Sequence, residues 1–306
     1  MKKEKWNSIV EIAYSTKKGI VITLLDIFIS WIFFGTSIDE YIKYNFYEKN
    51  IKLRKKYISI RNQKMFKRII NHTLKTINKE EMYNKYRNYI NRDYYFYSDK
   101  NNIKDFIQDK KEIVIKSLND KNYEELKKVK SIKDLDSFNE YLKDNNLYLE
   151  EKIIQDKKMS ILANNEMVYL KVLTFSNKNK KEILYSYITF YNPIKKCNIN
   201  IEIDTKYGKL KNIGIDDKLE EHKKHPISKS VFDKFQLPYW KNIKDKIIKI
   251  LSVDNEDVVV EWSYIIIKDD IEFVNKSYDI DFDRIQLINK RGRKDIINYV
   301  KNNLKK

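Results

Sequence analysis

The sequence is poor in the residues that build disulfides, metal sites and tight turns. Among 306 residues there are one cysteine, three histidines, three prolines and five glycines. The single cysteine, Cys197, excludes an internal disulfide and a cysteine-based zinc site. His222 and His225 are three residues apart in HKKH, but no third ligand lies near them in the sequence. We therefore expect a solvated loop there and no metal cluster.

Positively charged residues are abundant instead. The chain has 62 lysines and arginines against 44 acidic residues, a formal net charge of +18. Such an excess suggests an anionic partner, for example a nucleotide, a nucleic acid or an acidic membrane face. However, the basic residues are dispersed through nearly every segment, and AT-rich coding would produce the same richness in lysine, asparagine, isoleucine and tyrosine. A nucleic-acid site is disfavoured, because the basic stretch 50–75 has no platform of evenly spaced exposed rings.

Long hydrophobic runs are also scarce. The best membrane candidate is Gly19–Gly35, with about 15 apolar-dominated residues interrupted by Asp26, against the roughly 20 that a spanning helix needs. The run therefore predicts a buried helix. We expect a cytoplasmic protein whose contact with a membrane, if it has any, is peripheral.

The chain has two parts with different sequence patterns. The first part has helical periodicity, and Ser37-Ile-Asp-Glu40 forms a capping box, in which each side chain satisfies a free backbone amide. Further along, short strands alternate with helices, and strands dominate up to a hairpin within Val260–Phe282. This segregation predicts an α+β fold with an antiparallel sheet. The expected units are a helical N-terminal region at 1–75, a first subdomain at 76–146 and a second subdomain at 147–306.

Several landmarks follow one another in order along nearly the whole chain. They include NRDYYFY (Asn91–Tyr97), IVIK (Ile113–Lys116), FQLPYW (Phe235–Trp240), EWSYIII (Glu261–Ile267) and DFDRIQ (Asp281–Gln286). In this order they resemble the sugar-transfer-associated ATP-grasp proteins, which are related to α-L-glutamate ligases. The resemblance implies an ATP-grasp fold, in which two α+β subdomains hold ATP. An active member would phosphorylate a carboxylate and let an amine displace the phosphate, with Mg²⁺ and lysines neutralising the phosphate charge.

The resemblance offers five residues for four nucleotide contacts. Lys116, at the end of an expected strand, stands where the family has a phosphate-binding lysine. Either Lys79 or Lys85 stands for an earlier nucleotide lysine. Glu150 and Glu151 match the acidic hinge that holds adenine and ribose.

Three other features of the family are altered. Lys171 stands in place of an expected arginine, so the catalytic candidate keeps its charge but loses bidentate geometry. The glycine-rich loop that would close over the phosphates falls on Ser117–Lys130, which contains no glycine. The Gly-Gly substrate loop falls after Cys197-Asn198-Ile199, and its glycines are absent as well. We therefore expect the phosphate cover to be lost or rebuilt.

The hairpin carries the expected magnesium positions. Directly after Trp262, an expected aspartate is Ser263, and an expected Glu-x-Asn pair is Asn275 and Ser277. Mg²⁺ held by hydroxyls and an amide has nothing to offset the loss of its water. A register shifted by three would bring in Glu272 and leave Asn275 as an amide ligand, but an odd shift turns side chains to the opposite face of a sheet.

These losses favour a degenerate ATP-grasp protein of a surface-polysaccharide or related sugar-transfer context, impaired in catalysis and acting as a nucleotide-binding or protein-binding element. One alternative is an active carboxylate-amine ligase that uses ATP and Mg²⁺ on a sugar or amino-acid carboxylate. In that case Glu272, Asp279 or Asp281 would supply metal ligands. The other alternative is a basic module for nucleic acid or an acidic membrane, which would bind with a steep salt dependence.

Overall fold

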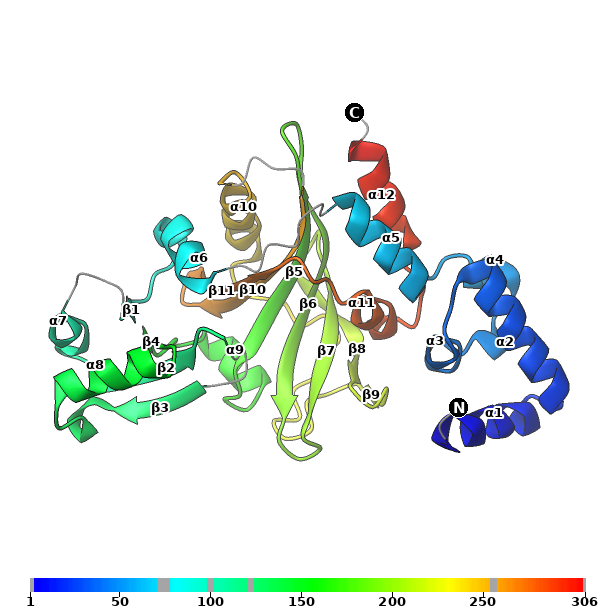
Figure 1. Ribbon diagram of the computed structural model, residues 1–306, viewed down its shortest axis with the longest axis horizontal. Helices are drawn as coiled ribbons and strands as arrows, with labels where there is room; N and C mark the ends of the chain where they lie inside the picture. The colour runs from blue at the N-terminus through cyan, green and yellow to red at the C-terminus, as the bar shows by residue number, and fades with distance from the viewer. Residues whose placement is uncertain (1–2, 71–77, 98–101, 120–123, 254–257, 305–306) are drawn as a thin grey trace.

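The computed structural model describes residues 3–70, 78–97, 102–119, 124–253 and 258–304. Figure 1 shows a four-stranded sheet at the left, a seven-stranded sheet in the centre and the first helices of the chain at the right. All strand pairs in both sheets are antiparallel among the described residues. The predicted α+β class and helical N-terminal region are confirmed. The two antiparallel α+β units that the resemblance implies are both present.

The small sheet has two faces with different environments. Its elements are β1 (Tyr94–Phe96), α7 (Ile103–Ile107), β2 (Glu112–Ser117), β3 (Glu124–Lys128), α8 (Leu135–Asp144) and β4 (Leu147–Glu151), with strand order β1-β4-β2-β3. Ile113 and Leu149 belong to a buried cluster under α7 and α8. Because side chains alternate along a strand, Lys116 and Glu150 point to the opposite face. Tyr148, on that same face, packs into the core cluster of the large sheet.

The large sheet is covered by helices on both faces. Its order is β11-β10-β5-β6-β7-β8-β9, built from β5 (Val168–Ser176), β6 (Lys181–Asn192), β7 (Cys197–Asp204), β8 (Lys209–Asp216), β9 (Glu221–His222), β10 (Val258–Ile267) and β11 (Asp270–Ser277). Helices α6 (Lys79–Lys85), α9 (Lys157–Leu162) and α10 (Trp240–Ile250) cover one face, and α5 (Ile60–Ile70), α11 (Phe282–Ile288) and α12 (Lys294–Leu304) cover the other. Along β5, Leu170 and Val172 contact the first set, whereas Leu173 and Phe175 contact the second. Lys171 therefore shares a face with Leu173.

The N-terminal region contains α1 (Lys3–Ser15), α2 (Ile20–Phe34), α3 (Ile38–Lys43) and α4 (Ile51–Arg54), with a short 3₁₀ turn at Phe46–Glu48. Two further 3₁₀ turns lie later in the chain, at Arg87–Tyr89 and Val129–Ser131. The capping box is confirmed: Ser37 Oγ accepts from Glu40 N at 3.1 Å, and Glu40 Oε2 accepts from Ser37 N at 2.8 Å. The helix predicted within Gly19–Gly35 forms as α2, but the prediction that it is buried is wrong, because most of its apolar side chains are exposed. Among the described helices, none has both the length and the apolar character to cross a membrane.

Candidate functional site

Arg92 joins the two sheets through buried ion pairs. It lies just before β1, and its guanidinium donates to Glu150 of β4 at 3.0 Å and to Glu272 of β11. Lys116 of β2 adds a second cation, with 3.0 Å between Lys116 Nζ and Glu150 Oε2. The hydroxyl of Tyr83 donates to the same carboxylate. In this network two cations and two carboxylates neutralise one another across the junction of the sheets.

The two carboxylates of the network differ in proton affinity. Burial alone would raise the pKa of Glu150, but Arg92 and Lys116 outweigh it and hold the pKa of Glu150 well below its usual range. At Glu272 burial outweighs Arg92, so the pKa of Glu272 is raised. Glu150 is therefore a constant negative partner for both cations, and Glu272 takes up a proton first as the pH falls.

The expected magnesium positions are neighbours on the large sheet. Ser263 of β10 lies opposite Asn275 of β11 on one side and opposite Lys171 of β5 on the other. Lys171 Nζ donates to Ser263 Oγ at 2.6 Å, and burial lowers the pKa of Lys171. Ser277 lies two residues beyond Asn275, opposite Glu261. The structure thus brings an ammonium group against the hydroxyl that stands where the resemblance expects a metal-binding carboxylate.

A β-bulge changes where Glu272 points. The register shifts between Ser263 and Tyr264, so that Ser263 faces Asn275 while Ile265 faces Glu272. Ser263 and Ile265 are two residues apart and share a face, and their partners therefore share it too, although three residues separate them. The bulge removes the objection that an odd spacing turns Glu272 away from Asn275. The carboxylate of Glu272 is nevertheless bound by Arg92.

Two other expected positions lie apart from this network, and a third, the stretch expected as a glycine-rich loop, touches it through Glu124, whose Oε2 is 3.7 Å from Lys116 Nζ. Glu151 follows Glu150 on β4 and points to the opposite face, where its Oε2 accepts from the Asp93 backbone amide at 3.3 Å. In the stretch expected to be a glycine-rich loop, β3 runs antiparallel to β2, and residues 120–123 lie outside the described ones. Cys197–Ile199, expected before the Gly-Gly loop, begins strand β7.

The two lysines proposed as the earlier nucleotide contact lie at opposite ends of α6. Lys79 Nζ is 5.8 Å from the ring centre of Tyr83, and Lys85 Nζ is 5.9 Å from that of Tyr86. Both rings are buried. Because Tyr83 also donates to the Glu150 carboxylate, Lys79 borders the network through the Tyr83 ring.

Sequence reasoning missed Glu261 as a member of the site. It lies on β10 two residues before Ser263 and so shares its face. Glu261 is buried, its Oε2 accepts from the Tyr187 hydroxyl at 3.2 Å, and burial raises its pKa in spite of the nearby Lys171. A charged residue within the apolar run VVVEWSYIII was the available signal, because an isolated carboxylate inside a central strand needs a partner.

The expectation of a solvated HKKH loop is wrong. His225 is fully buried, its Nδ1 accepts from two backbone amides, and burial lowers its pKa. His222 lies in β9, with 2.9 Å between its Nε2 and Asp216 Oδ2. Asp216, Glu220 and His222 present ligand atoms within 4.8 Å of one another. Asp216 also accepts from backbone amides of the connection between β8 and β9, so the cluster closes that turn.

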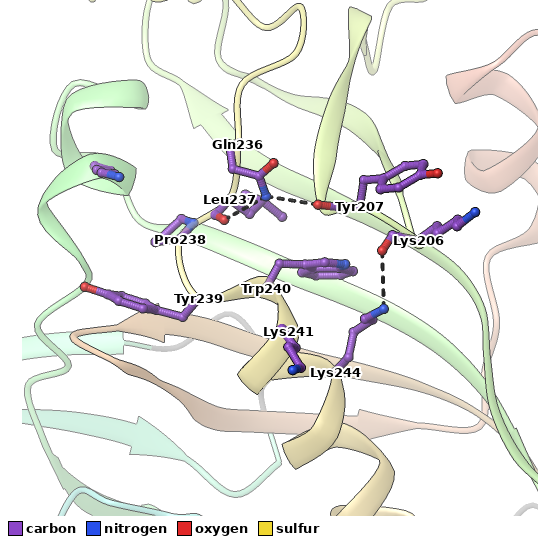
Figure 2. A pocket seen from close by; sticks show the side chains of 10 residues that line it. Lys206, Tyr207, Gln236, Leu237, Pro238, Tyr239, Trp240, Lys241 and Lys244 are labelled. Carbon is purple, nitrogen blue, oxygen red and sulfur yellow. Dashed lines mark hydrogen bonds between the residues drawn. The ribbon is translucent and has the colours of Figure 1, made fainter.

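A pocket of about 650 Å³ opens beside the start of α10, away from the predicted site residues (Figure 2). Trp240 lies at its centre, and Gln236 donates to the carbonyl of Tyr207 at 3.0 Å, which ties the FQLPYW segment to the turn before β8. The basic residues of its lining are Lys158, Lys206, Lys241 and Lys244. The landmark FQLPYW therefore builds a surface hollow and takes no part in the ion network.

Gly208 gives a test of how this hollow is built. Its φ is +73°, and a Cβ there would lie 2.1 Å from Trp240 Cγ. We expect Gly208→Ala to lower the free energy of unfolding by about 2 kcal/mol, because it adds a steric clash to the backbone strain. Gly19→Ala is the matched control, since Gly19 has φ +75° and no atom within 4 Å of its added Cβ. Urea denaturation of both variants measures the difference, and equal losses would contradict the packing role of Gly208.

Comparisons with known proteins give similarity at the level of solved structures. No family model matches the sequence, and no curated protein matches it. The chain is similar to N5-carboxyaminoimidazole synthase from Aspergillus clavatus in complex with ADP and 5-aminoimidazole ribonucleotide, with TM-score 0.42, 13% identity, and 72% of this chain and 50% of that chain covered. D-alanine-D-alanine ligase from Helicobacter pylori has TM-score 0.41, 14% identity, and 72% and 58% coverage. L-amino acid ligase from Bacillus licheniformis has TM-score 0.38, 10% identity, and 73% and 47% coverage. The chain spans about half the length of these proteins, and because the scores are low, the site is assigned from the chain's own residues.

Proposed function

We propose that the chain is a degenerate ATP-grasp protein that binds a nucleotide where its two sheets meet and does not catalyse magnesium-dependent ligation. The observation that carries this proposal is the hydrogen bond of 2.6 Å from Lys171 Nζ to Ser263 Oγ. The resemblance expects a carboxylate on Mg²⁺ at Ser263, and the chain has a hydroxyl bound to an ammonium. An ammonium group at that place repels a divalent cation.

The residues present do not fit Mg²⁺. Asn275 and Ser277 are uncharged, and the nearby carboxylate of Glu272 is bound by Arg92. Glu150 is bound by Arg92 and by Lys116. A magnesium ion would have to displace these buried cations and also give up its own water, which is unfavourable on both counts.

A phosphate group fits the same residues better. Lys116 and Lys171 each present an ammonium group, and a nucleotide phosphate would replace the Glu150 carboxylate as the partner of Lys116 in a charge-assisted hydrogen bond. The surface-polysaccharide context, the cytoplasmic location and the division at residues 1–75, 76–146 and 147–306 belong to the same proposal. The context is supported by the resemblance of the sequence landmarks, the location by the short apolar run interrupted by Asp26, and the division by the change from helical periodicity to alternating strands and helices.

ATP binding tests the proposal directly. We expect Lys116→Ala to weaken ATP binding about tenfold, because it removes one charge-assisted contact. Isothermal titration calorimetry measures this, with Lys152→Ala as the control, since Lys152 is an exposed lysine paired with Glu112 at 3.1 Å. Absence of ATP binding by the folded native chain would contradict nucleotide binding and would leave a protein-binding role.

One observation favours a second function, ATP-dependent carboxylate-amine ligation. Glu261 and Glu272 both lie on the sheet face of Ser263, and burial raises the pKa of each. An active ligase would need such carboxylates near the phosphates. Formation of ADP from ATP in the presence of Mg²⁺ and a mixture of amino acids would favour this function over the first.

A further inference from the structure

Helix α2 has its polar side chains on the inside. Asp26 pairs with Arg54, with 2.5 Å between Asp26 Oδ1 and Arg54 Nη1, and Ser30 Oγ accepts from the same guanidinium at 3.0 Å. Thr23 Oγ1 donates to the Gly19 carbonyl at 2.9 Å. Each of these polar groups of α2 is thus satisfied within the protein. The outer side of the helix can leave water without exposing an unpaired polar group.

The outer side of α2 is apolar. At 100° per residue its apolar side chains cover an arc of about 200° around the helix axis. Their exposed fractions run from 38% at Leu24 to 74% at Phe33. Figure 1 shows α2 at the outer right edge of the molecule, with α3 on its inner side. The exposed residues are Val21, Ile22, Leu24, Leu25, Phe28, Ile29, Trp31, Ile32 and Phe33.

This arrangement is the reverse of an ordinary surface helix, which turns its apolar stripe inward and its polar side to water. A contiguous apolar surface of this kind marks a place where another phase or molecule is bound. A folded protein partner covers one face of a helix. An apolar arc of about 200° suits a medium that contacts the whole outer side of the helix, and lipid is such a medium.

The charges around α2 identify the kind of lipid. Lys17 and Lys18 are exposed directly before its start, and Arg61 donates to the Trp31 carbonyl near its end. Residues 1–70 carry fifteen lysines and arginines against six acidic residues. Trp6 on α1 is also exposed, and tryptophan is a residue type that is enriched at membrane interfaces. Anionic headgroups complement this charge.

The length of α2 decides whether it can cross a bilayer or only lie at its surface. Its 15 residues extend about 22 Å, short of the roughly 30 Å hydrocarbon core. We propose that α2 lies in the plane of an anionic phospholipid bilayer surface, with its outer side inserted at the boundary of headgroups and acyl chains. This anchors the N-terminal region on a membrane and leaves the two sheets in water.

Flotation of the full chain with vesicles tests the proposal. Vesicles of phosphatidylglycerol and phosphatidylcholine are compared with vesicles of phosphatidylcholine alone, without nucleotide, so that the outcome is independent of ATP binding. We expect binding to the anionic vesicles, weakened by high salt, and at least tenfold weaker binding for Phe28→Glu/Phe33→Glu. The matched control is Ile154→Glu/Ile194→Glu, which alters two apolar residues that are 82% and 66% exposed elsewhere. The control is expected to bind as the native chain does.

Tryptophan fluorescence supplies a second readout. Trp6 and Trp31 are exposed, whereas Trp240 and Trp262 are buried, so a blue shift on adding anionic vesicles that Trp31→Phe reduces would place α2 in lipid. Vesicle binding that the Phe28→Glu/Phe33→Glu variant retains would overturn the proposal. So would a native chain that does not bind vesicles and instead self-associates through the same residues, because a second copy would then cover the helix.

Discussion

Replacing Arg92 by methionine is expected to lower the free energy of unfolding by about 3–5 kcal/mol. Arg92 is buried and is the cation between Glu150 of the small sheet and Glu272 of the large sheet. Its removal takes from the buried Glu272 the guanidinium that binds it and loosens the contact between the sheets. Urea denaturation followed by circular dichroism measures the loss.

Two further variants isolate the cause. Arg87→Met removes an exposed arginine from the same segment and is expected to change stability by less than about 1 kcal/mol. Arg92→Met/Glu272→Met removes the carboxylate that the first variant leaves unpaired, and it is expected to recover part of the loss. A loss below about 1 kcal/mol in Arg92→Met would show that the ion pairs do not hold the sheets together.

Restoring metal ligands is expected to have the second large effect. In the triple variant Lys171→Gln/Ser263→Asp/Asn275→Glu, two carboxylates replace a hydroxyl and an amide on adjacent strands, and the competing ammonium is removed. We expect Mg²⁺ to strengthen ATP binding by this variant about a hundredfold, because carboxylate oxygens offset the loss of water from the ion. Calorimetry of ATP with and without Mg²⁺ measures the gain.

The single variant Lys171→Gln is the control for the triple variant. It removes the ammonium without adding carboxylates, so Mg²⁺ is expected to have little effect on its ATP affinity. If the triple variant responds to Mg²⁺ no more than this control, the positions at Ser263 and Asn275 are not where a metal would bind, and the alignment of the hairpin with the family pattern is incorrect.

Helices and strands whose signals lie in neighbouring residues were predictable from the sequence. The capping box at Ser37 and Glu40 and the hairpin of β10 and β11 each depend on residues close in the chain. Strand β3 was missed because EELKK is charged and exposed, and it becomes a strand only by pairing with β2. Strand β8 has a weak sequence signal for a similar reason, since KLKNIGID is polar along much of its length.

The composition of α2 predicted a helix correctly and its burial wrongly. The hydrophobicity of a segment indicates that its side chains avoid water. It does not indicate whether they pack inside the protein or against another apolar medium. Asp26 was interpreted as an interruption of an apolar run. Together with Ser30, it forms the inner contact of the helix with Arg54.

The site depended on contacts that sequence spacing does not encode. Arg92 and Glu272 are 180 residues apart, and a β-bulge decides that Glu272 and Asn275 share a face. Neither the bulge nor the contact between Lys171 and Ser263 has a local signature. The residue types at Ser263 and Asn275 were readable, but the cation beside them was not.

The affinity of the native chain for ATP, measured by calorimetry once with excess Mg²⁺ and once with EDTA, tests the central claim most directly. With Lys171 bound to Ser263 in place of a metal carboxylate, ATP is predicted to bind with the same affinity in both conditions, within about threefold, and to remain unhydrolysed. Binding at least tenfold tighter with Mg²⁺, together with ADP formation, would contradict the account and establish a metal-dependent enzyme.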